Sequence, residues 1–364
     1  MPTRDQVLQI LDLARWAPSG DNTQPWRFEI LSPEHVVVHG FDTREHCVYD
    51  LDGHPSQISL GALLETAAIA ASAHGLVLDI SRRTGLPESK PTFDLRLHAD
   101  PSMRRDALIE QIERRSVQRR PLSTRALSAA EKQQLQDCLP AGYQVHWLEG
   151  FATRLQTALL MFRSARLRLT TPEAYRVHCD IIDWDCQFSA TKVPDQALGV
   201  DAATTRLMRF VMKSWGRVQF FNRFLAGTWA PRLQMDFAPS LACAAHFVLY
   251  APAQPKTVDD YVEAGRAMQR FWLKTTELQL QLQPEVTPLV FARYAREQRR
   301  FSSVSGAMAA AIDVKSRLEL LIGADLARAA VYMGRVGAGP SPSSRSLRRP
   351  LEDLIINTQA GAPS

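Results

Sequence analysis

A polar turn with several potential ligand groups lies near the start of the printed sequence, at Ala17-Pro-Ser-Gly-Asp-Asn-Thr-Gln-Pro-Trp26. Proline and glycine favour a turn, and short hydroxyl, carboxyl and amide side chains can bond to the backbone or to a ligand. The apolar residues Trp26 and Phe28 follow directly. So dense a polar turn indicates a ligand-binding edge rather than a plain connection. Its candidate binding residues are Pro18, Ser19, Asn22 and Gln24.

Two arginine clusters occur far from this turn in the sequence, at Arg114-Arg-Ser-Val-Gln-Arg-Arg120 and at Arg345-Ser-Leu-Arg348. The planar guanidinium group can grip two oxygens of a phosphate at once. Each cluster taken alone is more often a solvated surface. Together with the polar turn, they would suit an extended ligand that has one phosphate and a polar ring edge. The candidates here are Arg114, Arg115, Ser116, Gln118, Arg119, Arg345 and Arg348.

Helical and strand patterns alternate along the chain and predict an α+β fold. Helices are expected over 3–16, 59–74, 107–115, 128–139, 151–169, 202–224, 258–280 and 289–321, the last with an interruption near residue 302. Strands are expected over 26–31, 35–40, 76–82, 92–98, 143–148, 243–251 and 329–336. Residues 283–288 are expected to form a turn, and residues 337–344 a loop.

The segment from 171 to 240 is unusually rich in both aromatic and basic residues. Its expected helix, about 202–224, is amphipathic with a basic face. Three interpretations stay open: a packed helical hairpin with solvated arginines, a lid over a pocket, and a helix that lies on a membrane surface.

The bulk composition is typical of a globular protein, with 45% hydrophobic and 22% charged residues and a net charge of +5. The five cysteines are sparse and odd in number, which favours reduced thiols over a disulfide framework. His178, Cys179 and Cys186 could be imagined as metal ligands, but no CxxC pair supports a metal site. We expect no nucleic-acid partner, no signal peptide, no membrane span and a cytoplasmic location.

The motifs closely resemble those of the flavin (FMN) nitroreductase superfamily. The middle motif of that family is matched nearly completely by Ala17-Pro-Ser, Asn22, Gln24-Pro-Trp and Phe28. Residues 114–119 resemble the Arg-Arg-Ser motif with which family members begin. Residues 348–352 resemble their final basic-Pro-Leu-Glu motif, although Ser346 stands where lysine is usual and Arg345 would substitute for it.

The order of these motifs is inverted, because the first family motif follows the middle one. The simplest account is a pair of degenerate nitroreductase-like copies, an arrangement that resembles the Acg-type pseudo-dimers. Residues 1–104 would form the first half and residues 105–364 the second. The second half would contain a helical lid insertion over 171–240 and a C-terminal loop and arm over 337–364. Each copy would have a mixed or antiparallel sheet flanked by helices.

This resemblance implies one composite flavin site per chain, within either a monomer or a homodimer. Arg115, Arg119 and Arg348 would hold the FMN phosphate, with Ser116 adding a bond. Ser19 and Asn22 would approach the isoalloxazine ring from the other half. Pro284 and Glu285 resemble the family's loop beside flavin N5. The chemistry would reside on the flavin, so no catalytic side chain is nominated.

The resemblance implies an oxidoreductase that NAD(P)H reduces and that passes electrons to a small-molecule acceptor not identified by the sequence. A different class stays open beside it, because some superfamily members dehydrogenate azolines, fragment flavin or sequester FMN. A closed lid would favour sequestration, since a nicotinamide must stack on an exposed flavin face. The sequence does not decide between these functions.

Overall fold

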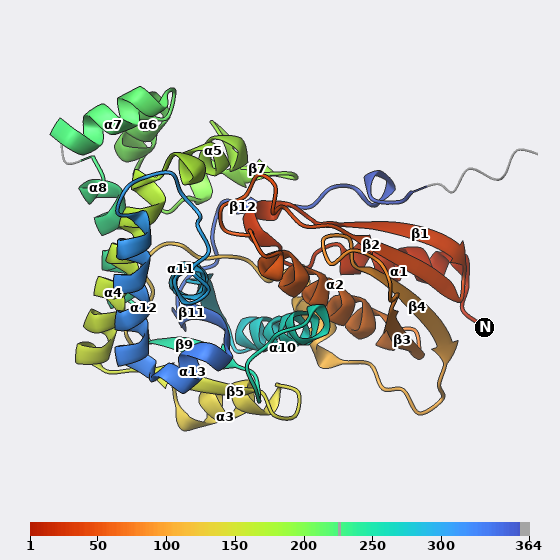
Figure 1. The fold of residues 1–364 in the computed structure, drawn as a ribbon. Helices are drawn as coiled ribbons and strands as arrows, with labels where there is room; N and C mark the ends of the chain where they lie inside the picture. Colours follow the sequence, from red (N-terminus) through yellow and green to blue (C-terminus); the bar gives the residue numbers. More distant parts are fainter. Residues whose placement is uncertain (225–226, 357–364) are drawn as a thin grey trace, which may run out of the picture.

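The computed structural model describes residues 1–224 and 227–356, and in them two four-stranded antiparallel sheets (Figure 1). The first sheet has the order β1-β2-β4-β3, and the second has the order β5-β9-β11-β10. The strands are β1 Trp26–Ser32, β2 His35–Gly40, β3 Leu76–Arg82, β4 Thr92–Ala99, β5 Gln144–Leu148, β9 Ala245–Tyr250, β10 Leu280–Pro284 and β11 Ala330–Ala338. The predicted α+β fold with antiparallel sheets is confirmed.

The two sheets have the same connectivity when each is followed along the chain. In both, the first two strands in chain order are hydrogen-bonded neighbours, and a long helix follows them. The fourth strand in chain order then lies between the second and the third: β4 lies between β2 and β3, and β11 lies between β9 and β10. Each sheet is also preceded by a helix, α1 Arg4–Ala14 or α3 Ala129–Asp137. The division into two halves stays a prediction, and this repeated topology supports it.

The two long helices, α2 His54–Ser72 and α10 Val258–Glu277, pack against each other at the centre of the molecule (Figure 1). They approach so closely at Gly61 and Gly265 that a Cβ on Gly61 would lie 1.9 Å from the carbonyl oxygen of Val262. Buried side chains of both helices and both sheets form one hydrophobic cluster. Residues before and after position 105 therefore share this cluster, and a further cluster lies mainly among the helices of residues 151–181 and 287–322.

The long connection between β5 and β9 begins with α4 and contains most of the remaining helices. It comprises α4 Phe151–Thr170, α5 Pro172–Ile181, α6 Ala202–Val211, α7 Trp215–Phe224, α8 Trp229–Pro231 and α9 Ala238–Leu241, with short strands β6 Ile182–Asp183, β7 Phe188–Ser189 and β8 Val193–Pro194. A second excursion between β10 and β11 holds α11 Thr287–Arg296, α12 Ala307–Ile322 and α13 Ala324–Ala329. Helices α6, α7 and α8 lie at the end of the molecule far from the first sheet (Figure 1).

Three predicted elements differ from the structure. Residues 280–284 form the strand β10, where we expected the end of a helix and a turn. The single helix expected over 202–224 is divided into α6 and α7, and the helix expected over 107–115 is a short 3-10 helix, Ala107–Gln111. Of the predicted insertion and arm, residues 225–226 and 357–364 lie outside the described residues.

An arm at residues 345–356 leaves the second half and crosses to the first. Its short strand β12 Arg345–Ser346 pairs in parallel with β7. Further along, the amide of Phe28 in β1 donates to the carbonyl of Leu354 at 2.8 Å, and Ile356 donates back to Phe28 at 2.7 Å. The arm thereby extends the first sheet beyond β1. No helix in the described part is both long and apolar enough to cross a membrane.

Candidate functional site

A cavity of about 280 Å³ lies between the two halves, close to the lower limit of small-ligand sites. The first half contributes the turn at residues 18–22 and the first turns of α2. The second half contributes residues 115–117 and Arg119, the side chains of Met268 and Trp272 on α10, and the segment from β10 into α11. The arm closes the cavity with Arg345, Ser346 and Arg348, together with Ser344 just before it. The cavity is therefore composite, because neither half has a complete wall.

Three arginine side chains from distant parts of the sequence converge on this cavity: Arg115, Arg345 and Arg348. Arg115 donates from Nη2 to the carbonyl of Trp16 at 2.9 Å, and its guanidinium lies over the ring of Trp272 at 4.6 Å. Arg345 donates to the carbonyl of Arg115 at 3.3 Å. Among the described residues, no carboxylate forms an ion pair with any of the three. The cluster is therefore a concentration of positive charge without a protein counter-ion.

The cluster also retains donor groups that the protein does not satisfy. The Nε atoms of Arg115 and Arg345 are buried and have no hydrogen-bond partner in the described structure. Burial, followed by the neighbouring Arg345, lowers the pKa of Arg115 to about 9. Burial, followed by Arg115 and Arg345, also lowers the pKa of Arg348. An anion would supply both the missing acceptors and the missing charge, since buried donors are normally paired.

Asn22 and Gln24 connect the polar turn to other segments. The Asn22 side chain accepts from Nη1 of Arg348 at 3.0 Å and donates to the carbonyls of Lys192 and Leu347, each at 3.2 Å. Gln24 is fully buried and does not line the cavity. It bonds the carbonyl of Ala190 at 2.8 Å and the amide of Arg349 at 2.9 Å. Gln24 therefore positions the cavity wall from behind, whereas Asn22 both holds Arg348 and lines the cavity beside Pro18 and Ser19.

Arg119 lines the cavity at a different place from the arginine cluster. Its charged neighbours are Asp21, Arg335 and Arg168, and its Nη1 donates to the carbonyl of Ala197 at 3.1 Å. Asp21 has a left-handed backbone, with φ of 52°, and burial raises its pKa to about 6 against the opposing effect of Arg119. Asp21 was not predicted as a site residue, although an aspartate within a dense polar turn is a recognisable candidate for ligand binding.

A second cavity of about 530 Å³ adjoins the first, and both are lined by Gly20, Asp21, Pro55, Arg119 and Val193, among others. Its walls come from α4, α5, α6, α7 and the start of α11, and most of its lining is apolar. Arg168 and His178 are among its polar members. Asp21 and Arg119 therefore stand at the junction of two spaces, one between the halves and one beneath the inserted helices.

Glu285 belongs to a buried network behind the cavity and not to its lining. It accepts from Nη1 of Arg335 at 2.9 Å and bonds Nδ1 of His246 at 2.6 Å. Burial opposes charge on the imidazole, but Glu285 outweighs this and raises the pKa of His246. Arg335 in turn donates to the carbonyl of Arg119 at 2.7 Å. The network fixes the backbone that presents Arg119, and the adjacent Pro284 lines the cavity.

The structure thus brings together nine of the thirteen predicted site residues. Those that line the first cavity are Pro18, Ser19, Asn22, Arg115, Ser116, Arg119, Pro284, Arg345 and Arg348. Gln24, Gln118 and Glu285 are buried elsewhere, and Arg114 is exposed to solvent. Gln118 donates to the carbonyl of Pro340 at 2.8 Å, which holds the loop that leads to the arm. Trp272, Asp21 and Arg335 were missed, and only Asp21 lies in a motif that could have revealed it.

Each of the candidate metal ligands His178, Cys179 and Cys186 contacts another group of the protein. His178 bonds the hydroxyl of Tyr49 at 3.1 Å, and the thiol of Cys179 contacts the carbonyl of Met212 at 3.6 Å. Within residues 1–224 and 227–356, no group of three or more His, Cys, Asp or Glu side chains is arranged to hold a metal ion.

Comparison with known proteins places this geometry in context. Residues 1–54 match the family model described as the nitroreductase family. The uncharacterized protein MT1398 of Mycobacterium tuberculosis is 23% identical over 296 residues, which cover 80% of this chain. The chain spans about 40% of the length of that relative.

Two solved structures are also similar. One is a nitroreductase-like family protein from Bacillus cereus, with a TM-score of 0.36 and 12% identity over 70% of this chain and 97% of that one. The other is a nitroreductase with bound FMN from Bacteroides fragilis, with a TM-score of 0.35 and 8% identity over 71% of this chain and 99% of that one. The family match is confined to residues 1–54, the segment that contains the polar turn, so the chain is similar to the nitroreductase family over this segment.

Proposed function

We propose that the chain is an FMN-dependent oxidoreductase with one composite flavin site. The observation that carries this proposal is the cluster of Arg115, Arg345 and Arg348. Within residues 1–224 and 227–356, two of its buried Nε donors have no partner and no carboxylate pairs with it. These features fit a phosphate group. FMN would supply hydride and electron transfer at this cavity.

The residues present fit the parts of FMN as follows. Arg115, Arg345 and Arg348 would hold the phosphate, so that Arg345 takes the place first expected for Arg119. Ser116 and Ser19 carry hydroxyl groups on the cavity wall, and Asn22 keeps Arg348 in position. Apolar side chains of α2, α10 and α11 would exclude water from the rest of the cavity.

Asp21 and Arg119 are suited to a role beside the acceptor and not beside the phosphate. Both line the first cavity and the adjoining one, where the larger apolar space could receive an acceptor next to the flavin site. A carboxyl with a pKa of about 6 exchanges a proton readily near neutral pH, and a guanidinium donates to an acceptor oxygen. We propose NAD(P)H as the reductant.

The test begins with the absorbance spectrum of the purified chain, before and after equilibration with FMN. Anaerobic addition of NADPH or NADH should then bleach the flavin bands, because the proposed site accepts hydride. A yellow protein that dithionite bleaches but neither nicotinamide does would indicate the sequestering or specialised alternative. A colourless protein that takes up no FMN would contradict the flavin site itself.

A further inference from the structure

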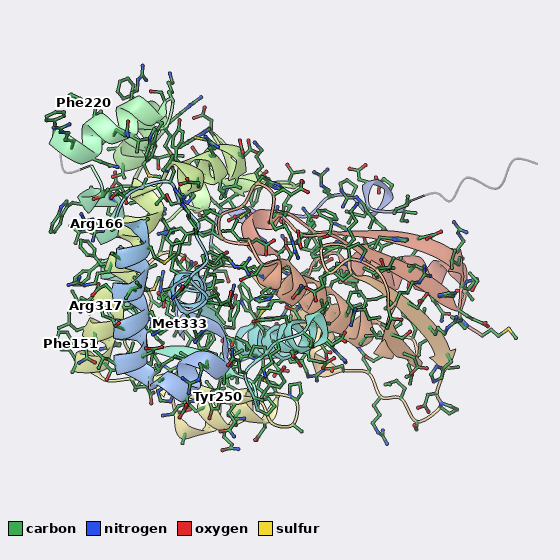
Figure 2. All side chains as sticks on the ribbon, in the orientation of Figure 1. Phe151, Arg166, Phe220, Tyr250, Arg317 and Met333 are labelled. Atoms are coloured by element: carbon green, nitrogen blue, oxygen red, sulfur yellow. The ribbon has the colours of Figure 1, made fainter. Side chains whose placement is uncertain are left out.

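The outer surface of helices α6, α7 and α8 exposes several large apolar side chains in one region. The exposed fractions are 48% for Phe210, 53% for Phe220, 63% for Phe224 and 55% for Trp229. Figure 2 shows Phe220 at the outer edge of the molecule on this surface, which we call the aromatic face. Monomeric proteins rarely leave such large side chains exposed together, so the face requires an explanation.

The same helices carry positive charge without negative charge to balance it. From residue 202 to residue 235 the sequence contains six arginine or lysine residues and no aspartate or glutamate. Arg206, Lys213, Arg217 and Arg223 are exposed, and none of these four forms an ion pair with the part of the chain that the structure describes. An ordinary solvated helix surface mixes charges of both signs.

The cations and the aromatic rings lie against each other rather than on separate faces. The guanidinium of Arg217 lies 4.4 Å from the ring centroid of Phe210, and that of Arg223 lies 5.4 Å from the ring of Phe224. An anionic surface that met these guanidinium groups would therefore also contact the rings.

Exposed apolar residues elsewhere do not share this pattern. Leu320 on α12 is 87% exposed, but it lies on a helix where Arg317 and Lys315 pair with Asp313 and Glu319. Phe151, exposed at the first residue of α4, is distant from the aromatic face (Figure 2). Ile312 on α12 and Leu159 on α4 are also exposed, but all four are aliphatic or single aromatic side chains without a cation stacked on them in the described structure.

We propose that the aromatic face docks on a membrane surface that contains anionic lipids. The rings would enter the boundary between headgroups and acyl chains, while the arginines would bind lipid phosphates. A nucleic-acid duplex or an acidic protein would satisfy the charges, but it would not require four large exposed apolar side chains beside them. A single strand stacks its bases on aromatic rings along a basic groove, whereas Phe220 lies at the outer edge of the molecule (Figure 2). A lipid surface accommodates both features, so the observations favour it.

Vesicle co-sedimentation tests the proposal with the purified full chain and does not depend on flavin or turnover. We expect binding to vesicles that mix phosphatidylcholine with phosphatidylglycerol, and much weaker binding to phosphatidylcholine alone. The double variant Phe220→Ser/Phe224→Ser should bind the anionic vesicles roughly tenfold less tightly, because two inserted rings are lost. Arg217→Glu/Arg223→Glu should lose at least as much.

Matched controls use exposed apolar residues outside the face. Phe151→Ser and Leu320→Ser should bind vesicles as the unchanged chain does, and Phe220→Leu/Phe224→Leu should retain most of the binding. Far-UV circular dichroism checks that each variant is folded. Absence of binding to anionic vesicles would overturn the proposal. The proposal would also be wrong if a control variant lost as much vesicle binding as the serine double variant. The same holds if the chain bound a nucleic acid or an acidic protein but not the anionic vesicles.

Discussion

Arg115 has the environment of an anion-binding residue, since it is buried, has an unpaired Nε donor and lies among other cations. We expect Arg115→Ala to bind FMN roughly 10- to 100-fold less tightly, because a hydrogen bond to a charged group contributes about 1.5–3 kcal/mol. Fluorescence titration of the apoprotein with FMN measures the change.

Arg114 provides the matched control for this prediction. It is adjacent in sequence and has the same charge, but its side chain is exposed and does not line the cavity. Arg114→Ala should therefore keep the FMN affinity of the unchanged chain. Equal losses in the two variants would mean that net charge, and not a buried phosphate site, governs flavin binding.

Asp21 provides a prediction about pH and stability. Burial raises its pKa from 3.8 to about 6 in the folded chain, so the folded state binds more protons than the unfolded state between these values. The free energy of unfolding therefore decreases as the pH rises from the unfolded pKa of 3.8 to the folded pKa of about 6. Asparagine has no carboxyl group to ionise, so Asp21→Asn should remove this decrease in stability. Asparagine also tolerates the left-handed backbone at this position.

We expect Asp21→Asn to raise the free energy of unfolding at about pH 8 by about 1–3 kcal/mol, with little change near pH 4. The range extends down to about 1 kcal/mol because the Asp21 side chain is only partly buried, which weakens the effect of burial on its pKa. Urea denaturation at the two pH values measures the effect. Asp325→Asn, at an exposed residue, is the control. A gain that is equal at both pH values would contradict the assigned protonation.

At the scale of elements, the crossing of α2 and α10 leaves no room for side chains at Gly61 and Gly265. Gly61→Ala would force the helices apart, because the added Cβ meets backbone atoms, which cannot rotate away. We expect a loss of about 1–3 kcal/mol in the free energy of unfolding, as for overpacked cores. FMN affinity should fall as well, since both helices line the cavity.

Gly216→Ala is the control for this substitution. Gly216 lies in the exposed helix α7, and a Cβ there would meet nothing within 4 Å. Alanine should leave stability unchanged or raise it by up to about 1 kcal/mol, because it favours helix. Thermal unfolding of the two variants compares them directly. A Gly61→Ala chain as stable as the Gly216→Ala chain would show that the helices can separate without cost.

Elements with a strong local pattern could be predicted from the sequence, and elements fixed by distant contacts could not. The strands at 35–40 and 76–82 have the predicted bounds because their apolar residues follow a strand pattern. Strand β10 was missed, since Leu280 and Leu282 continue the apolar pattern of the preceding helix and Pro284 indicates a turn. Its pairing with β11, more than 45 residues away, decides its conformation.

The same limit applies to the site. The arginines could be named from the motifs, but their grouping depends on tertiary structure: Arg345 joins Arg115, whereas Arg119 turns toward Asp21. The buried network of Glu285, His246 and Arg335 has no sequence motif, because its members lie far apart in the chain. The adjoining cavity is formed where the inserted helices pack together, and the aromatic and basic composition of residues 171–240 does not predict such a cavity.

At the scale of the whole molecule, the composite cavity predicts one FMN per chain. The second half has no counterpart of the polar turn, since α3 ends at Asp137 and β5 begins at Gln144. The sequence of residues 1–104 contains no Arg-Arg-Ser motif like that at residues 114–116. The ratio of flavin absorbance to protein concentration in the saturated protein measures the stoichiometry. Two FMN per chain would contradict the account of two degenerate halves.

The arm sets an order of events during synthesis. Residues 345–348 complete the arginine cluster, and they are translated only after both sheets have been made. The same arm then pairs with β1, which is among the first strands to leave the ribosome. If the proposed flavin site is correct, the growing chain cannot complete it before the arm is made, and the outer edge of β1 has no partner until then. We therefore expect FMN binding and the pairing of that edge to be completed together, after the last strand of the second sheet has been translated.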